Sequence, residues 1–362
     1  MNLRAGAATA GWGLFCACSW TWCIGMFMPI ILLRDFGWPG FLVFAVPNVL
    51  GCAAFGYVLR NAGRRAELLQ RHERAAVVFS AITIAYHMFF MAFLATMIAR
   101  GEPRAPLIAM ALPAGVYLAG YGFSWMPQRA WPAAAAALYA ASIAVFTGVG
   151  TATLNATQWS GTLTTTDLMC LAPALVFGFL LCPYLDLTFH RALDASPSPH
   201  AFAIFGIAFI PILLLTVAYW QGVTQPLVVT YITVQATFTV AAHLREIRER
   251  SWPRGRGSRS ALLLVPATAV ALVLLPGDGV NTYLRFLGFF GLIFPAYVLV
   301  FMTRRTPIAP RTVDLVGWAV AMIAFVPVYE VAFVHRITWP AGIPVAGLLA
   351  WWAWRRRTDR GL

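Results

Sequence analysis

The chain has 362 residues, of which 60% are hydrophobic and only 11% are charged, against about 25% in an ordinary soluble domain. This is too little charge to cover the surface of a soluble protein of this size, so a soluble enzyme and a disordered chain are both excluded. The net charge is +13, and all 26 basic residues are Arg. Because these Arg residues lie between apolar segments and form no single face or tail, they indicate membrane orientation and not a nucleic-acid partner.

Long apolar segments follow one another along the whole chain, and they predict an all-α integral membrane protein. A helix that crosses the hydrocarbon core of a bilayer needs about 20 apolar residues, and twelve segments come near this length. The first is too long for the apolar region of a cleavable signal peptide, so none is expected. The twelve predicted transmembrane helices are residues 11–33, 38–60, 76–99, 104–124, 131–149, 165–185, 201–221, 225–246, 260–276, 283–303, 312–334 and 338–356.

The Arg residues fall mainly on alternate connections between these segments. One side of the membrane receives five of the 26, and the side of the N-terminus receives the other 21; the five are Arg34, Arg100, Arg104, Arg285 and Arg336. Since Arg is retained on the cytoplasmic side, both termini are predicted to be cytoplasmic, in a cytoplasmic (inner) membrane of bacterial type. The Arg-rich connections 61–75 and 247–259 are predicted to be inner loops that contact anionic lipid.

Two of the segments carry polar residues, Gly or Pro in mid-membrane: residues 19–29 (SWTWCIGMFMP) in the first and residues 170–178 (CLAPALVFG) in the sixth. Unwound backbone is tolerated at this depth only where it lines a cavity, and there it offers N–H and C=O groups to a solute. The first and sixth segments each begin a set of five, and five is odd, so the second set is inverted relative to the first. Matched interruptions in inverted halves indicate a transporter; the alternative is that Gly and Pro are simply frequent in membrane helices.

The predicted solute site follows from these interruptions together with His87, the one ionisable residue near the middle of a segment. Its predicted members are Ser19, Trp22, Gly25, His87, Pro173, Phe177 and Gly178.

A sodium site is predicted between the first and eighth segments. Thr230, Thr233 and Thr237 share one helical face, and the hydroxyls of Thr233 and Thr237 opposite Thr21 would suit Na⁺, which prefers oxygen ligands. The alternative is that each Thr bonds to the carbonyl four residues earlier. Towards the membrane surfaces, Asp186 is expected to pair with Arg191, and Glu330 with Arg336.

Motifs of known catalytic chemistry are missing from the sequence. There is no HExxH, GxSxG or P-loop pattern, no His cluster with metal-ligand spacing, and no C-x-x-C pair among the six Cys. The chain is therefore not expected to be an enzyme, and no cofactor is predicted apart from a bound Na⁺.

Several stretches together resemble a known family, the sodium:solute symporters of the amino acid–polyamine–cation superfamily. The first two resemble the first two core helices of these symporters, the third falls where they carry a Gln-Arg motif and related nucleobase permeases an Asp-Phe-Thr-Arg motif, and the fourth is similar to the tenth core helix. The stretches are residues 19–22 (SWTW), 37–50 (GWPGFLVFAVPNVL), 182–193 (CPYLDLTFHRAL) and 281–288 (NTYLRFLG).

The resemblance implies a LeuT-like fold of five plus five helices in an inverted repeat. Residues 1–150 would form the first repeat, residues 151–303 the second, and residues 304–362 two extra C-terminal helices with a basic cytoplasmic tail. It places the solute between helices 1 and 6, flanked by helices 3 and 8, and sodium between helices 1 and 8. Asn48, Asp186 and Arg191 lie in the matching motifs and would have structural or gating roles.

The expected function is secondary active transport: alternating-access symport of a small polar solute with a cation, Na⁺ by resemblance. The alternative is a non-transporting membrane subunit of the same fold, a sensor input or an assembly scaffold with a protein partner. It is motivated by the near absence of charge at the centre of the segments and by their sparse polar residues.

The Arg distribution generates a test of orientation. A green fluorescent protein fused to the C-terminus is expected to fluoresce in cells, because the tail stays in the cytoplasm, and a C-terminal alkaline phosphatase fusion is expected to be inactive. The reverse pattern would show that the Arg residues do not set the orientation.

Overall fold

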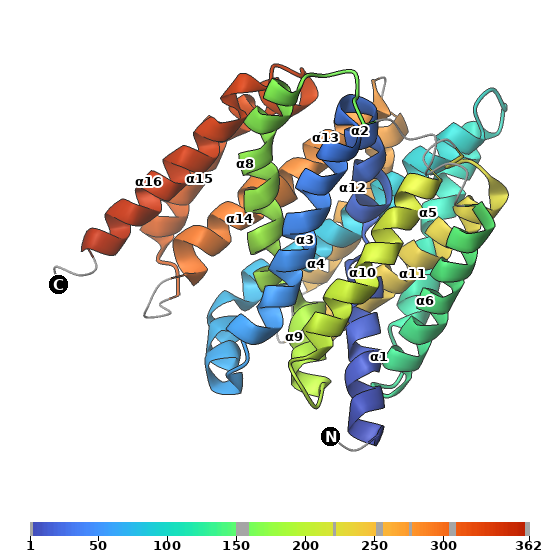
Figure 1. The fold of residues 1–362 in the computed structure, drawn as a ribbon, viewed down its shortest axis with the longest axis horizontal. Coiled ribbons are helices and arrows are strands. Elements are labelled where there is room, and N and C mark those ends of the chain that lie inside the picture. The colour runs from blue at the N-terminus through green and yellow to red at the C-terminus, as the bar shows by residue number, and fades with distance from the viewer. Residues whose placement is uncertain are drawn as a thin grey trace.

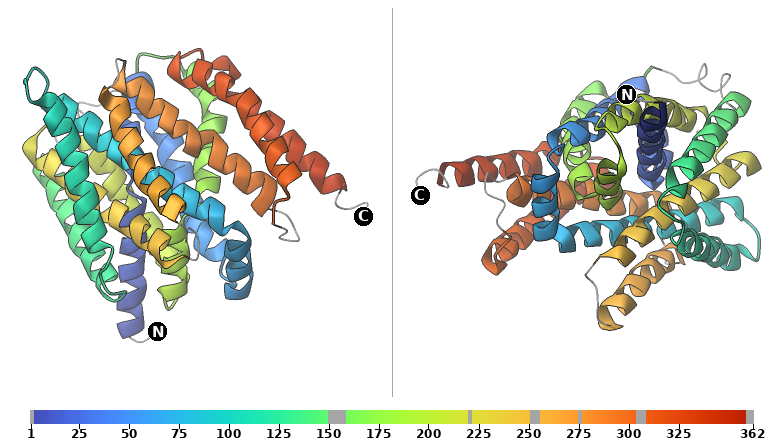
Figure 2. Two further views of the ribbon diagram at one scale, coloured as in Figure 1. Left: turned by 180° about the vertical axis from the view of Figure 1, so that it is seen from behind. Right: turned by 90° about the horizontal axis from the view of Figure 1, so that it is seen from below.

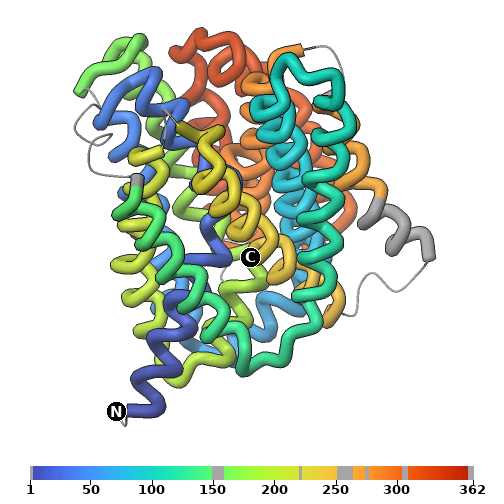
Figure 3. Tube along the Cα trace, turned by 90° about the vertical axis from the view of Figure 1, so that its right-hand side faces the viewer, coloured from blue at the N-terminus to red at the C-terminus, as the bar shows by residue number. Residues whose placement is uncertain are grey.

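The structure of the chain is a computed structural model and describes residues 3–149, 159–219, 222–250, 256–274, 277–303 and 309–358. Every regular element in these ranges is a helix, and most helices run along a common direction (Figures 1 and 3). The protein is thus a multi-pass membrane protein, as its composition predicts. The predicted boundary between the two repeats, at residues 150–151, lies outside the described residues.

The α-helices follow one another through short connections. They are α1 (Leu3–Trp20), α2 (Cys23–Phe36), α3 (Trp38–Val58), α4 (Ala62–Ile98), α5 (Ala105–Phe123), α6 (Ala130–Val149), α8 (Thr165–Leu181), α9 (Leu187–Ala195), α10 (Ala201–Ala218), α11 (Pro226–Glu249), α12 (Arg256–Ala271), α13 (Gly279–Gly288), α14 (Phe294–Tyr297), α15 (Thr312–Tyr329) and α16 (Gly342–Thr358).

Shorter turns join or extend some of these helices. Turns of 3₁₀ helix are η1 (Cys182–Leu185), η2 (Leu272–Leu274) and η6 (Trp339–Ala341), and π-helical turns are η3 (Phe289–Ile293), η4 (Val298–Met302) and η5 (Glu330–Val334).

Each of the twelve predicted segments is helical over most of its described residues, but the count of twelve membrane spans is not confirmed. Nine helices of the described residues are long and apolar enough to cross a membrane, and α1 with α2 makes a tenth span that bends by 61° at a short break. The segments predicted at 260–276 and 338–356 correspond to α12 and α16, helices of 16 and 17 residues.

Two groups of helices pack within the molecule. We call α4, α5, α11 and α12 the scaffold group, because α4 packs against each of the others and α11 packs against α5. We call α1, α2, α3, α8 and α10 the bundle group, because α10 packs against α1, α2 and α3, and α3 packs against α8. Helices α15 and α16 lie at one edge, beside α8 and the α13–η4 segment (Figures 1 and 2).

The prediction of an inner loop at residues 61–75 is wrong for most of that range, because residues 62–71 form the first turns of α4. Asn61 accepts a hydrogen bond from the backbone N–H of Arg64 and so caps the helix. A kink at His72 (φ −115°, ψ 17°) separates this Arg-rich portion from the apolar remainder of the 37-residue helix. In the other predicted inner loop, residues 251–255 lie outside the described residues.

The predicted interruption at 170–178 is also wrong. Helix α8 continues through Pro173 to Leu181, and the chain leaves the α-helix only at η1 and Asp186. Proline removes one helical hydrogen bond, which membrane helices tolerate. Asp186 is the stronger signal, because its side chain accepts a hydrogen bond from the Thr188 N–H and starts a new helix, α9.

Close packing of α3 on α8 depends on Gly51. A Cβ atom at this position would lie 2.5 Å from the Phe179 carbonyl oxygen and 2.9 Å from the Leu180 Cα, both of them backbone atoms of α8. Gly115 in α5 is a matched contrast, because nothing lies within 4 Å of a Cβ atom built there.

Gly51→Ala is therefore expected to lower the free energy of unfolding by about 1–3 kcal/mol through overpacking, although Ala favours a helix over Gly. Gly115→Ala is expected to leave stability unchanged or slightly raised. Thermal unfolding of the purified variants in detergent checks this; equal melting temperatures for the two variants would contradict the close approach of α3 and α8.

Candidate functional site

Two interruptions meet in the centre of the molecule. The first break is the non-helical pair Thr21–Trp22 between α1 and α2, and the second break is residues 182–186 between α8 and α9. We call their meeting point the crossing. There the Thr188 hydroxyl donates a hydrogen bond to the Ser19 hydroxyl (3.1 Å), and the ring centroids of Trp20 and Phe189 lie 4.9 Å apart. All four side chains are buried.

Side chains from other helices satisfy the main-chain groups around the first break. From α13, the Tyr283 hydroxyl donates to the Cys23 carbonyl (3.0 Å), and from α10 the Thr216 and Tyr219 hydroxyls donate to the carbonyls of Gly25 and Met26 (each 2.9 Å). An unpaired amide or carbonyl at this depth costs several kcal/mol. These hydroxyls therefore satisfy the main-chain carbonyls around the break from within the protein.

His87 is part of the same network in its neutral form. Its Nδ1 lies 2.7 Å from the Thr83 carbonyl, which can only accept, so Nδ1 carries the hydrogen. Its Nε2 accepts the Cys23 N–H at 3.3 Å, which requires a free lone pair. The structure thus brings His87 to the first break, where the sequence predicted a solute ligand.

The centre of the crossing is filled mainly by Trp22. Its Nε1 donates to the Ser19 carbonyl (2.7 Å), and its ring contacts those of Trp20, Phe79, His243 and Phe290. A void of only about 10 Å³ remains, room for a single water at most. It is lined by Trp20, Trp22, Ile24, Gly25, Asn48, Phe179, Cys182 and Phe290.

Asn48 reaches the crossing from α3. Its side-chain oxygen accepts a hydrogen bond from Trp20 Nε1 at 2.7 Å, which ties α3 to the first break. Ser19, Trp22, Gly25, His87 and Asn48 are thus gathered at one place.

The predicted site residues of α8 are not gathered there. Pro173 is exposed, Phe177 is buried in α8 away from the void, and Gly178 lies where α8 packs on η3. A Cβ atom at Gly178 would lie 2.9 Å from the Phe290 carbonyl oxygen. The glycine therefore allows close packing and does not break the helix.

The face of α11 that meets the first break is not the predicted threonine face. Gln235 Nε2 donates to the carbonyls of Cys18 (2.6 Å) and Thr21 (3.3 Å), and Thr239 one turn later lies within 3.5 Å of both oxygens. Thr233 and Thr237 are two residues out of phase, about 200° around the helix. Their hydroxyls bond back to the carbonyls of Val229 and Thr233, both at 2.8 Å.

Thr21 itself donates back to the Ala17 carbonyl of α1 (2.7 Å). The three predicted sodium ligands are therefore not brought together. Instead, a side-chain amide occupies the carbonyl oxygens of the first break. The prediction missed this face, although the sequence carries a signal for it: the polar amide of Gln235 in mid-segment, with Thr239 one turn later.

Below the second break, Arg191 pairs with Glu246 of α11 and not with Asp186 as predicted. Arg191 Nε lies 2.7 Å from Glu246 Oε1, and both side chains are at least nine-tenths buried. The guanidinium also lies over the rings of Phe15 (4.7 Å) and Trp131 (4.6 Å). This pair, which the sequence did not predict, joins α9 to α11. It lies between the crossing and the end of the molecule that carries the Arg-rich first turns of α4, which we call the Arg-rich end.

At the opposite end, the expected pair of Glu330 with Arg336 is replaced by two other pairs. Arg285 of α13 pairs with Glu330 (2.7 Å), and Arg336 pairs with Asp35 at the end of α2 (2.7 Å). Partial burial lowers the pKa of Arg336, and the Asp35 carboxylate only partly offsets this. These pairs tie α2 and α13 to the segments at the two ends of η5.

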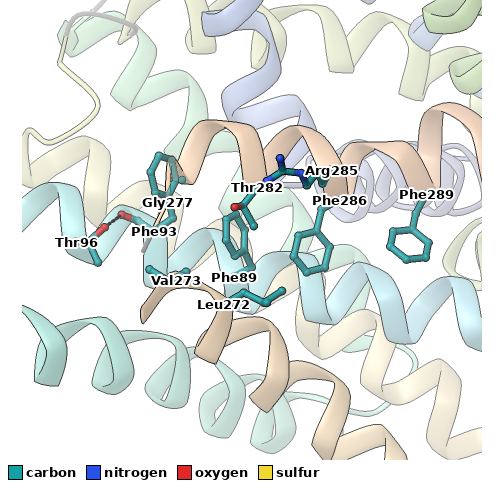
Figure 4. A pocket seen from close by; sticks show the side chains of 11 residues that line it. Phe89, Phe93, Thr96, Leu272, Val273, Gly277, Thr282, Arg285, Phe286 and Phe289 are labelled. Carbon is teal, nitrogen blue, oxygen red and sulfur yellow. Dashed lines mark hydrogen bonds between the residues drawn. The ribbon is translucent and has the colours of Figure 1, made fainter. Parts of the chain in front are cut away.

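A cavity with a volume of about 530 Å³ lies at this Arg-poor end. Figure 4 shows side chains of α4 and α13 around it, with the hydroxyls of Thr96 and Thr282 and the Arg285 side chain among the rings of Phe89, Phe93, Phe286 and Phe289. Tyr86 stacks on Phe286 (5.2 Å) and on Phe290 (5.8 Å). Since Phe286 lines the cavity and Phe290 lines the central void, this aromatic layer separates the two.

Comparisons with known proteins identify no relative: no family model matches the chain, and neither a curated protein nor a solved structure does so.

The Arg191–Glu246 pair generates a stability test. Arg191→Met leaves the buried Glu246 carboxylate with only the more distant Arg250 (3.8 Å) and is expected to cost about 3 kcal/mol, the lower end for a broken buried pair. The double variant Arg191→Met/Glu246→Gln removes both charges and is expected to recover most of that loss. Thermal unfolding of the two variants measures this, and a double variant no more stable than the single one would refute the pairing.

Proposed function

We propose that the protein is a secondary transporter that binds a small polar solute at the crossing and exposes it alternately to the two sides of the membrane. The observation that carries the proposal is the meeting of two helix breaks in the buried centre, with main-chain groups held by side chains of other helices. Such groups can exchange an internal hydrogen bond for one to a solute, which a continuous helix does not permit.

The arrangement of helices supports a LeuT-like inverted repeat within the same proposal. The breaks fall in the first and sixth predicted spans, which is where that fold has them, and these spans belong to the bundle group. Spans three, four, eight and nine correspond to the scaffold group α4, α5, α11 and α12. Rocking of one group against the other would open the crossing first to one side and then to the other.

The proposed closed gates lie on either side of Trp22. Towards the Arg-poor end, the layer of Tyr86, Phe286 and Phe290 separates the crossing from the large cavity, which would receive the solute. Towards the Arg-rich end, the Arg191–Glu246 pair closes the gap between α9 and α11. With both gates shut, the structure corresponds to an occluded state in this proposal.

Aromatic rings and neutral polar groups line the crossing, so the solute class is constrained. Trp20, Trp22 and Phe290 offer ring faces, and Asn48 offers an amide. Ring faces of this kind bind planar or cationic groups. The proposed solute is a small polar molecule with such a group. Anionic lipid at the exposed residues Arg60, Arg64 and Arg74 is the proposed second partner.

The alternative function is a non-transporting subunit, and one observation favours it. The central void holds no more than a water, and the main-chain groups at the break are already satisfied internally. Under this alternative the crossing is a rigid structural joint, and no solute would shift the melting temperature or enter liposomes.

Gly25→Ala separates the two functions. A Cβ atom at Gly25 meets only Leu213 Cδ2, at 4.0 Å, so the variant is expected to fold with equal or greater stability. The added methyl group occupies space beside the void, so uptake of a solute by proteoliposomes is expected to fall by about tenfold or more.

The solute for this assay is found by thermal-shift screening of small cationic and aromatic solutes on the purified protein, and Gly115→Ala is the matched control. No thermal shift with any solute, together with copurification of a stoichiometric partner, would favour the non-transporting subunit. Full uptake by Gly25→Ala would place the solute elsewhere.

A further inference from the structure

The second break holds a buried carboxyl group that the proposed transport site does not use. Asp186 is fully buried, and its Oδ1 accepts the Thr188 N–H at 2.7 Å. Its Oδ2 is buried as well and has no hydrogen-bond partner among the described residues. A carboxylate oxygen without a donor is among the most costly groups to bury.

No cation of the described part of the chain pairs with this carboxyl. Arg191, five residues further on, pairs with Glu246 instead (2.7 Å), and His190 is bonded through Nε2 to the Tyr184 carbonyl (3.0 Å). An ionised Asp186 would therefore be a buried charge without compensation.

The other groups that act on Asp186 do not supply that compensation. Cys16 of α1, Cys52 of α3 and Cys182 of η1 are buried near it as uncharged thiols, and the negative charge of Glu246 of α11 opposes a second one. Helices α4 and α14, which also pack against η1, carry His72 and Tyr297, and those two side chains bond to each other (3.0 Å).

The amino-terminal end of α9 favours a negative Asp186, but this is the smaller effect. The Thr188 N–H bonds the side chain directly, the Thr188 hydroxyl and the Phe189 N–H also favour the charged form, and α9 has nine residues. The attraction of a helix terminus amounts to a fraction of the cost of burying an unpaired carboxylate.

We propose that Asp186 is a proton-binding site and that the proton is the coupling ion of the transporter. In the closed state the proton is bonded to Oδ2. It is taken from water on one side of the membrane and returned to water on the other, and no other bond is made or broken.

The position of Asp186 links its protonation to movement of α9. The residue caps α9, and the next-but-one residue, Thr188, bonds to Ser19 of the first break. Loss of the proton creates a charge that needs water, so α9 moves away from α1 towards the Arg-rich end. The Gln235 amide donates to the carbonyl oxygens of Cys18 and Thr21, so it links α11 to the same first break.

This inference rests on the proposed transport function for its coupling part, so its first test needs no solute. Infrared spectra of the full-length protein in nanodiscs are recorded at pH 6, where exposed carboxyls are already ionised. The wild type is expected to show the C=O stretching band of a protonated carboxyl. Asp186→Asn is expected to lose it while keeping the cap, because Asn caps helices as well as Asp does.

The double variant Arg191→Met/Glu246→Gln is the control, since it removes the other buried carboxyl of this region, and it is expected to keep the band. Absence of the band in the wild type, or its persistence in Asp186→Asn, would overturn the proposal.

The second test uses the solute found by screening. A pH gradient is expected to raise accumulation in wild-type proteoliposomes several-fold, whereas Asp186→Asn is expected to exchange solute without any response to the gradient. An equal response of both would refute coupling through Asp186. If no solute is transported at all while the infrared band follows Asp186, the proton site stands and the transport function fails.

Discussion

The structure depends on one constraint: in the interior of a membrane protein, every main-chain amide and carbonyl needs a partner. The first break exposes such groups from Cys18 to Met26, and helices α10, α11 and α13 supply the side chains that bond to them. The bundle and scaffold groups are therefore joined at their centre by directional hydrogen bonds. Each of these bonds can be exchanged for a bond to a solute, and this property makes the crossing a candidate binding site.

Ion pairs lie on both sides of the crossing and separate it from the two ends of the molecule. The Arg191–Glu246 pair lies on one side, and the pairs at Arg285 and Arg336 lie on the other. Between them the interior is aromatic, and the void beside Trp22 measures only about 10 Å³. The proposed transport would require movement of Trp22, because its ring contacts those of Trp20, Phe79, His243 and Phe290 at the centre.

The sequence predicted the helical membrane class, the multi-pass arrangement and the first break, because apolar length and the polar run at Ser19–Trp22 are local signals. It misplaced the second break, since Pro173 is a more visible breaker than Asp186, although only Asp186 starts a new helix. The sodium site was predicted at Thr233 and Thr237 and not beside Gln235, because three hydroxyls on one helical face are a more visible pattern than a single amide. The packing of helices distant in sequence decides which face of α11 contacts α1 and which carboxylate pairs with Arg191.

The central claim is that the crossing opens alternately, and the distance between α9 and α11 at the Arg-rich end reports this most directly. Spin labels at Ala195→Cys and Glu249→Cys allow that distance to be measured by pulsed electron paramagnetic resonance. The account predicts at least two distance populations, whose ratio shifts when a bound solute or the pH is changed. A single narrow distance under every condition would show that the crossing is a rigid joint and would contradict the account.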